Sequence, residues 1–215
     1  MRFVVGTLVF VGLLLGPSVV SHAQEGPQFG LTLGVNRVTL QSPGADPGRY
    51  FAFSGGVVLR QHLYGPASIQ AELLLNQQGA RIPSEEGGAI DYGAGYLDLP
   101  LLLHLQAPTV QSITLYGEAG GFGGLKVFER QTPGGGDINV AFDTGTSFYR
   151  RFNGGVLAGM GAMIPIRGSR LNLTLRRGWG LRDVAQDVTD QPFSEAPFPP
   201  EGRTRTWSLL LRFGF

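Results

Sequence analysis

Residues 205–215 read RTWSLLLRFGF, and this stretch decides the fold. From position 207 onward, every second residue has a large apolar side chain, which is the two-residue period of a β-strand. One face carries Trp207, Leu209, Leu211, Phe213 and Phe215. The last residues of a soluble domain usually fray into water. An apolar face that continues to position 215 therefore predicts a neighbour that receives it.

The composition is unusual for a soluble globular protein. Charged residues make up 15% of the 215 residues, whereas roughly 25% is typical of soluble domains. Glycine is abundant, with 34 residues, and cysteine is absent, which excludes disulfides and thiolate chemistry. The formal net charge is +1 with no basic cluster in the sequence. That balance argues against nucleic acid as a partner.

Residues 1–23 have the pattern of a cleaved secretory signal. Arg2 precedes the apolar run FVVGTLVFVGLLL, and Gly16 and Pro17 interrupt it shortly before the small residues Ser21 and Ala23. A basic start, an apolar run of this length and small residues before the cleavage point are typical of export signals. We expect cleavage after Ala23, and the alternative is an uncleaved anchor. Residues 24–215 then form the mature domain.

After residue 24 the chain reads as eight strand-like segments. They cover residues 28–40, 49–63, 67–81, 95–106, 112–128, 149–166, 170–184 and 207–215. Most of them alternate between apolar and polar residues, although the glycines of the sixth leave its facing ambiguous. Pro100 lies inside the fourth segment, and because proline removes a ladder donor we expect a bulge or bend there.

The connections between these segments alternate in length. We expect short ones at 64–66, 107–111 and 167–169, and long ones at 41–48, 82–95, 130–148 and 185–202. In an up-and-down meander this places all short turns at one end and all long loops at the other. That asymmetry, with an even number of strands, is typical of outer-membrane barrels with short periplasmic turns.

A soluble lipocalin-like barrel is the rival interpretation, with the leucines inside and the polar faces in water. The polar faces are poor in charge, and several segments exceed the ~9–11 residues that a tilted transmembrane strand needs. Aromatic residues also gather near the long loops, as interfacial girdles do: Tyr50, Phe51, Phe53, Tyr96, Phe148, Tyr149, Phe152 and Trp179. We therefore predict an all-β fold, an eight-stranded antiparallel up-and-down transmembrane β-barrel.

The chain resembles the PorT-like outer-membrane β-barrel family of Bacteroidota and related bacteria. The segments that carry the resemblance are GLTLGVN, AELLLNQQGA, YLDLPLLLHL, LYGEAGGFGG, RRGWGLRDV and the terminal FGF. The resemblance spans nearly the whole mature chain and implies eight antiparallel strands in the outer membrane of a Gram-negative cell. Founding members are linked to protein secretion, a role that we do not carry over. The family brings no catalytic residues.

With the leucine faces outward, six charged side chains point inward: Arg60, Glu72, Asp98, Glu118, Arg176 and Arg212. The interior of an eight-stranded barrel is just wide enough to be filled by side chains. An unpaired buried charge costs several kcal/mol, so each of these needs a partner. Arg60 and Glu72 fall almost opposite one another across a hairpin, and we predict that they pair. We expect the wider network to be structural, and a proton or solute path is the alternative.

Few residues suggest catalysis or metal binding. His62 and His104 are the only histidines after position 23, and neither has a convincing serine or aspartate partner. The DTGTS at residues 143–147 is a single copy in a loop, and GEAGGFGG precedes no helix that could bind phosphate. We therefore expect no enzyme activity, no cofactor and no metal. A lipid-modifying enzyme of the barrel wall is the remaining alternative.

The expected function is that of a small outer-membrane barrel with a side-chain-filled interior. We expect outer-membrane lipid and the barrel-assembly machinery as its partners, together with an unidentified surface or secretion-complex partner. Small-solute binding or passage is the second class of function. The aromatic strand from Trp207 to Phe215 resembles the C-terminal signal that the insertion machinery reads, with Trp207, Leu209, Leu211 and Phe213 facing lipid and Arg212 facing inward.

Overall fold

The computed structural model describes residues 26–41, 50–84, 88–132, 139–141, 149–166, 169–184 and 202–214. None of these segments is a helix long and apolar enough to cross a membrane. The long strands are β1 (Gln28–Gln41), β2 (Tyr50–Tyr64), β3 (Ala67–Ser84), β4 (Gly88–Gln106), β5 (Thr114–Thr132), β7 (Phe152–Ile166), β8 (Ser169–Gly180) and β9 (Arg203–Gly214). A short strand, β6 (Asn139–Ala141), pairs with the far end of β5. The predicted signal at residues 1–23 lies outside the described residues.

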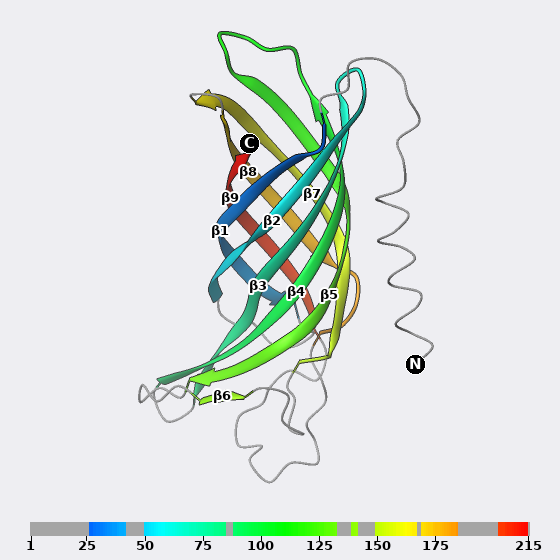
Figure 1. Ribbon diagram of the computed structural model, residues 1–215. Coiled ribbons are helices and arrows are strands. Elements are labelled where there is room, and N and C mark those ends of the chain that lie inside the picture. Colours follow the sequence, from blue (N-terminus) through cyan, green and yellow to red (C-terminus); the bar gives the residue numbers. More distant parts are fainter. Residues whose placement is uncertain are drawn as a thin grey trace, which may run out of the picture.

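The eight long strands form one closed antiparallel barrel (Figure 1). Each long strand pairs with the long strands before and after it in the sequence, and β9 pairs with β1 to close the ring. Leu33 lies opposite Leu211 and Val35 opposite Leu209 across this seam. The prediction that residues 207–215 close the barrel against the first strand is therefore confirmed for the described part. Closure gives every long strand a partner on each side.

The two short connections that the structure describes lie at one end of the barrel, as predicted. Residues 167–168 of the third, and most of the predicted long connections at 41–48, 130–148 and 185–202, lie outside the described residues. The β2–β3 turn consists of Gly65 and Pro66, and residues 107–113 join β4 to β5. Gly65 has a φ of 56°, a left-handed conformation that glycine adopts at little cost. β1 begins and β9 ends at this same end (Figure 1).

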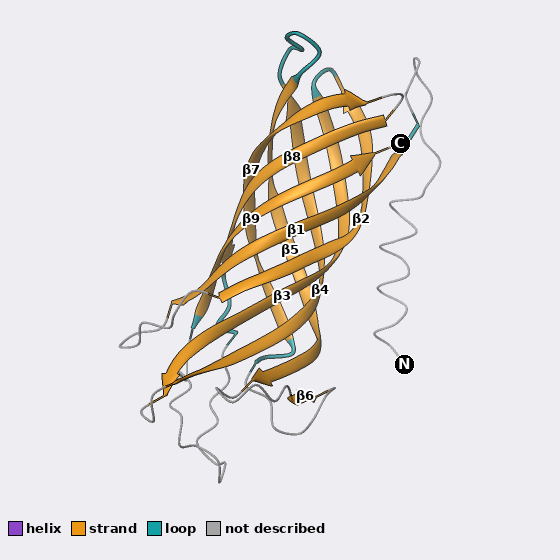
Figure 2. Cartoon of the chain, turned by 90° about the vertical axis from the view of Figure 1, so that its left-hand side faces the viewer, coloured by secondary structure: helices purple, strands orange, loops and turns teal. Residues whose placement is uncertain are grey.

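At the opposite end, the predicted long connection at residues 82–95 is wrong. β3 continues to Ser84 and β4 begins at Gly88, and the register runs without a shift through Ile82 and Ile90. Gly, Pro, Ser and Asp suggested a loop here, but each strand pairs with the other and the hairpin simply continues. Because β3, β4 and β5 have 18, 19 and 19 residues and β8 and β9 only 12, one wall extends beyond the rest (Figure 2).

Apolar side chains cover the outside of the barrel. On β9, Trp207, Leu209, Leu211 and Phe213 are between 42% and 47% exposed, whereas Arg212 is 1% exposed. These facings agree with the prediction, and Phe215 lies outside the described residues. Leucines on β1, β3, β4 and β8 are exposed in the same way. A soluble barrel buries such residues, so the exterior is that of a barrel surrounded by lipid.

The strand whose facing the sequence left open is β7. Val156, Met160 and Ile164 are exposed, whereas Asn153 and Met163 are buried. Odd-numbered residues from Asn153 to Met163 therefore face the interior. The glycines and alanines between them hide this alternation in the sequence.

The predicted aromatic girdle is only partly correct. Phe51, Phe53 and Phe152 are exposed on the outside, but Tyr50, Tyr96 and Tyr149 are buried in the interior. A buried phenol needs a hydrogen-bond partner, and the interior supplies one to each. The Tyr50 hydroxyl accepts from Arg130 Nη2, and those of Tyr96 and Tyr149 donate to backbone carbonyls. Trp179 is half-buried, and Phe148 lies outside the described residues.

Pro100 does not form the expected bulge. It pairs with Phe122 of β5, and the β4–β5 register is unchanged around it. On the other side the β3–β4 pairing stops at Ala71–Leu101 and resumes at Leu74–Asp98 in the same register. Pro100 thus interrupts the β3–β4 pairing locally, although neither strand has an extra residue there. The register shift of β4 and β5 lies at Gly95 and Tyr96 instead.

Candidate functional site

The barrel interior contains four charged side chains in direct contact. Glu72 on β3, Glu118 on β5, Arg176 on β8 and Arg212 on β9 are each 4% exposed or less. They face inward because all four occupy the polar positions of alternating strands. They come from strands around the whole circumference, so their side chains meet near the barrel axis.

Each arginine of this group contacts both glutamates. Arg176 Nη1 lies 2.8 Å from Glu72 Oε2, and Arg176 Nη2 lies 2.7 Å from Glu118 Oε1. Arg212 Nη2 lies 2.8 Å from Glu72 Oε1, and Arg212 Nη1 lies 2.9 Å from Glu118 Oε2. Arg212 Nη1 also donates to Thr174 Oγ1 at 3.0 Å. We call these four residues the interior network; in it, each guanidinium bridges two carboxylates and each carboxylate bridges two guanidiniums.

The direct pair predicted between Arg60 and Glu72 is absent. Residue 70 lies opposite Arg60 in the register, and Glu72 lies opposite Val58 instead. Arg60 donates through Nε and Nη2 to Gln70 Oε1 at 2.9 and 2.7 Å, and Gln70 Nε2 in turn donates to Glu72 Oε1 at 2.5 Å. The hairpin pairs Tyr64 with Ala67, and after an irregularity between His62 and Tyr64 it places Gln70 opposite Arg60. Gln70 thus connects the two charges.

Asp98 belongs to a different layer of the interior. Asn76 Nδ2 donates to Asp98 Oδ2 at 2.8 Å, and Asn36 Nδ2 donates to Asn76 Oδ1 at 2.7 Å. The other carboxylate oxygen of Asp98 has no hydrogen-bond partner. A small cavity of about 40 Å³ beside it is lined by Asp98, Asn76 and Arg176 among others, which is space enough for a water molecule.

Neutral residues complete the interior, and the charge-based prediction missed them. Gln70 connects Arg60 to the network, and the Tyr116 hydroxyl shares a hydrogen bond of 2.5 Å with Thr174 Oγ1. All three occupy inward positions of strands whose alternation is visible in the sequence. The signal was therefore available, because every polar side chain on an inward face must find a partner and not only the charged ones.

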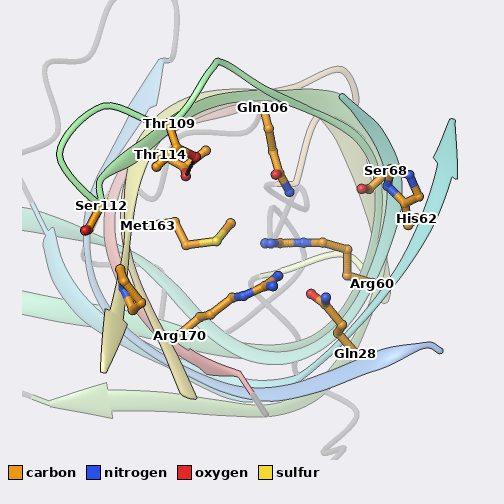
Figure 3. A pocket seen from close by; sticks show the side chains of 11 residues that line it. Gln28, Arg60, His62, Ser68, Gln106, Thr109, Ser112, Thr114, Met163 and Arg170 are labelled. Atoms are coloured by element: carbon orange, nitrogen blue, oxygen red, sulfur yellow. Dashed lines mark hydrogen bonds between the residues drawn. The ribbon is translucent and has the colours of Figure 1, made fainter. Parts of the chain in front are cut away.

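A water-accessible cup of about 600 Å³ lies between the network and the short-turn end of the barrel. Arg60 and Arg170 both extend toward its middle, and Gln28 and Gln106 line its wall (Figure 3). None of the described residues that line it is an aspartate or glutamate. The cup ends where the interior network begins.

The two histidines lie near the cup but form no catalytic arrangement. Ser68, His104 and Glu118 are direct neighbours across three adjacent strands, which is the juxtaposition that would favour nucleophilic catalysis. However, both ring nitrogens of His104 have no hydrogen-bond partner, and its ring packs against Tyr116 with 4.4 Å between ring centroids. Glu118 is engaged by two arginines. His62 lines the cup, and the described residues contain no group of three or more potential metal ligands.

Comparison with known proteins agrees with the barrel. Residues 22–186 match the family model described as outer membrane protein beta-barrel domain. Neisserial surface protein A is similar in structure, with 11% identity, coverage of 90% of this chain and 98% of that chain, and a TM-score of 0.50. OprG from Pseudomonas aeruginosa has 9% identity, coverage of 91% and 98%, and a TM-score of 0.48.

The Ail protein of Yersinia pestis, in complex with the heparin analogue sucrose octasulfate, has 11% identity, coverage of 89% and 100%, and a TM-score of 0.43. No curated protein sequence matches this chain. At such identities the likeness concerns the fold alone, and the eight-stranded architecture of Neisserial surface protein A is the one that this chain shares.

Proposed function

Because the chain belongs to the outer membrane protein beta-barrel domain family, we propose that it is a non-enzymatic, non-conducting scaffold of the outer membrane. Its barrel anchors and positions the long-loop end, and its function is surface interaction or support of an envelope or secretion complex. Within this proposal the chain is a PorT-like barrel, exported by a signal that is removed after Ala23. The supporting sequence segments are those that resemble the PorT-like family.

The observation that carries this proposal is the interior network. Its ion pairs join Glu72 of β3 to Arg176 of β8, and in the strand order these two strands are separated by three others in either direction around the ring. The pairs therefore cross the lumen at its widest separation. Ions cannot pass without breaking contacts of 2.7–2.9 Å between buried charges. A barrel closed in this way is a rigid wall and a poor channel.

The long-loop end is the natural place for a partner. β3, β4 and β5 extend beyond the shorter strands at this end (Figure 2). A hairpin held by an unbroken register up to Ser84 and Gly88 gives a firm platform on which binding residues can be displayed. The proposed orientation places this platform outside the cell and both chain ends in the periplasm, as in other barrels with short periplasmic turns.

Conductance in planar lipid bilayers tests the closed lumen. We expect the refolded wild-type protein to give no channel events, and Glu72→Ala/Arg176→Ala to give openings because the crossbar is removed. Channel events of wild-type protein with a defined unit conductance would contradict the proposal.

The orientation has its own test, since the chain has no cysteine. Arg182 and Ser112 are both exposed and lie at opposite ends of the barrel. A membrane-impermeant maleimide on intact cells should label Arg182→Cys and spare Ser112→Cys until the outer membrane is permeabilised. The reverse pattern would place the extended hairpin in the periplasm.

A second candidate function rests on the cup. Arg60 is buried and bound to a neutral amide, and the described lining residues include Arg170 and no carboxylate. These features suit a small anion that enters from the short-turn end. Addition of inorganic phosphate or citrate should raise the unfolding temperature of wild-type protein by binding the folded state, and Arg60→Gln should abolish that shift. An equal shift in both proteins would exclude Arg60 from the site.

A further inference from the structure

The outer surface has a cluster of arginines on β1, β9 and β8, where the apolar band ends toward the long loops. On β1, β9 and β8 the outward residues Val35, Leu209 and Leu175 are neighbours in the register and belong to the apolar band. The next outward row is Arg37, Trp207 and Arg177, in the same strand order. One row farther, Arg205 lies beside Trp179. We call Arg37, Arg177, Arg205, Trp179 and Trp207 the basic face.

Arg177 of the basic face lies against both tryptophans, and none of the three arginines has a carboxylate partner among the described residues. The guanidinium carbon of Arg177 lies 4.8 Å from the ring centroid of Trp207 and 5.3 Å from that of Trp179. Arg177 Nε has no hydrogen-bond partner, and Arg37 and Arg205 are exposed. The nearest acidic residue of these strand ends, Asp183, pairs with Arg203 at 3.5 Å. Three like charges therefore share a small area with no anion among the described residues.

This distribution differs from a uniform interfacial belt. The outward-facing residues of β2 from Phe51 to Leu63, of β3 from Ala67 to Gln77, of β4 from Gly95 to Leu105 and of β5 from Leu115 to Val127 include no charged side chain. The outward residues of β7 from Phe152 to Ile164 include none either. Both tryptophans of the sequence lie on the basic face. At the start of β7 a single exposed arginine, Arg151, stacks on Phe152. Among the described side chains, the combination of three arginines with two tryptophans occurs on β1, β9 and β8, which indicates one docked ligand and not a general adjustment to the membrane surface.

We propose that the basic face binds the phosphorylated sugar head group of an outer-leaflet glycolipid, such as the lipid A part of lipopolysaccharide. This inference rests on the proposed orientation, which places the face at the outer leaflet. The row that it occupies borders the apolar band directly, so a ligand there has acyl chains beside Leu209 and a head group beside Arg37.

The chemistry of the face fits that ligand. Guanidinium groups bind phosphate through two parallel hydrogen bonds. Arg37 and Arg177 lie on either side of Trp207, two interstrand spacings apart, which is roughly 10 Å. A disaccharide head group with a phosphate at each end can reach both of them, whereas a single phosphodiester reaches one. The intervening indole offers an apolar surface to the sugar ring.

The two tryptophans make a direct test possible, because intrinsic tryptophan fluorescence reports on this face alone. The folded full-length mature protein in detergent micelles is titrated with bisphosphorylated lipid A. We expect a saturable change in emission and an apparent Kd at least tenfold higher for Arg37→Gln/Arg177→Gln/Arg205→Gln. The corresponding triple lysine variant should fall between the two, because it keeps the charge and loses the planar fork. Arg151→Gln, which changes an exposed arginine at the start of β7 outside the basic face, is the matched control and should titrate like wild type.

Two outcomes would overturn the proposal. One is a triple glutamine variant that keeps its heat-dependent gel mobility, and thus its fold, and binds lipid A with an apparent Kd within threefold of wild type. The other is equal affinity for phosphatidylglycerol, which would make the face a general site for anionic lipids.

Discussion

Arg176 reaches Glu72 on the opposite wall of the barrel, with Nη1 of the arginine 2.8 Å from Oε2 of the glutamate, although the two residues are 104 positions apart in the sequence. The two residues lie on β3 and β8, which are not neighbouring strands, so no backbone ladder joins them. The pair therefore adds cross-barrel connections that the hydrogen-bonded ladders do not supply. The same arginine bonds Glu118, which is itself bonded by Arg212, so the crossbar is shared by four strands.

The first prediction concerns one arm of this crossbar. Arg176→Met leaves Glu72 and Glu118 with one cation between them inside the barrel. Loss of one partner of a buried ion pair typically costs about 3–5 kcal/mol, because the remaining charge stays buried without compensation. We expect a loss of that size in the free energy of unfolding, measured by urea titration of the protein in lipid vesicles.

The matched double variant separates the pair from its parts. Glu72→Gln/Arg176→Met removes one charge of each sign and should recover part of the stability lost by Arg176→Met alone, because a neutral interior tolerates the change better. Strictly additive losses would mean that the two residues stabilise the barrel independently.

The second prediction uses the difference between Arg60 and the network arginines. Arg60 donates to the neutral Gln70, so Arg60→Met leaves an unsatisfied amide oxygen and no unpaired carboxylate. An unsatisfied buried polar group costs about 1–3 kcal/mol. Arg60→Met should therefore destabilise the barrel less than Arg176→Met in the same urea titration. An equal or larger loss would show that Arg60 compensates Glu72 through Gln70.

The sequence was sufficient to predict the closed barrel because the alternation is repeated in most of the strands and turn residues separate them. The alternation of the strand is enough to predict that Arg212 faces inward and Trp207 outward. Pairing inside the lumen does not follow from the alternation, because it depends on the register of each hairpin. In the β2–β3 hairpin, whose register is irregular between His62 and Tyr64, Gln70 and not Glu72 lies opposite Arg60.

The inward tyrosines were missed for a related reason. Tyr50 precedes the outward residues Phe51 and Phe53, and all three read together as a girdle in the sequence. Because side chains alternate along a strand, Tyr50 faces inward once Phe51 is known to face outward. The hydroxyl of Tyr50 then contacts Arg130, 80 residues away. Such long-range partners between strands have no signature in local sequence.

The third prediction tests the close approach of two strands at a glycine. A Cβ on Gly120 would overlap the backbone carbonyl of Leu101 on β4, whereas a Cβ on Gly123 has no heavy atom within 4 Å. Gly120→Ala should therefore lower folding yield and stability, because backbone cannot move aside as a side chain can. Gly123→Ala, three residues along the same strand, should change the free energy of unfolding by less than about 0.5 kcal/mol. Comparable behaviour of the two variants would contradict the clash.

The fourth prediction distinguishes a lipid-facing from a water-facing exterior. Leu211 is 43% exposed within the apolar band, and Tyr64 is 87% exposed at the short-turn end. In a bilayer, Leu211→Arg should cost about 2–4 kcal/mol and Tyr64→Arg about 0–1 kcal/mol, because the penalty for arginine falls toward the interface. On a soluble barrel both positions would be in water and neither change would matter much. Urea titrations of the two variants in the same vesicles give the comparison.

The fifth prediction concerns the end of the closing strand. Among the described residues, β9 pairs with β1 from Arg203 to Gly214, and Phe215 follows directly in the sequence. If Phe215 is part of the signal that the assembly machinery reads, its deletion should lower the amount of inserted barrel in cells. That amount is measured as the share of the protein that runs as a folded barrel on gels when the sample is not boiled. The purified deletion variant, refolded into detergent, should have nearly the stability of wild type. Normal insertion in cells together with a clear loss of stability in detergent would reverse the assignment and leave Phe215 a packing role only.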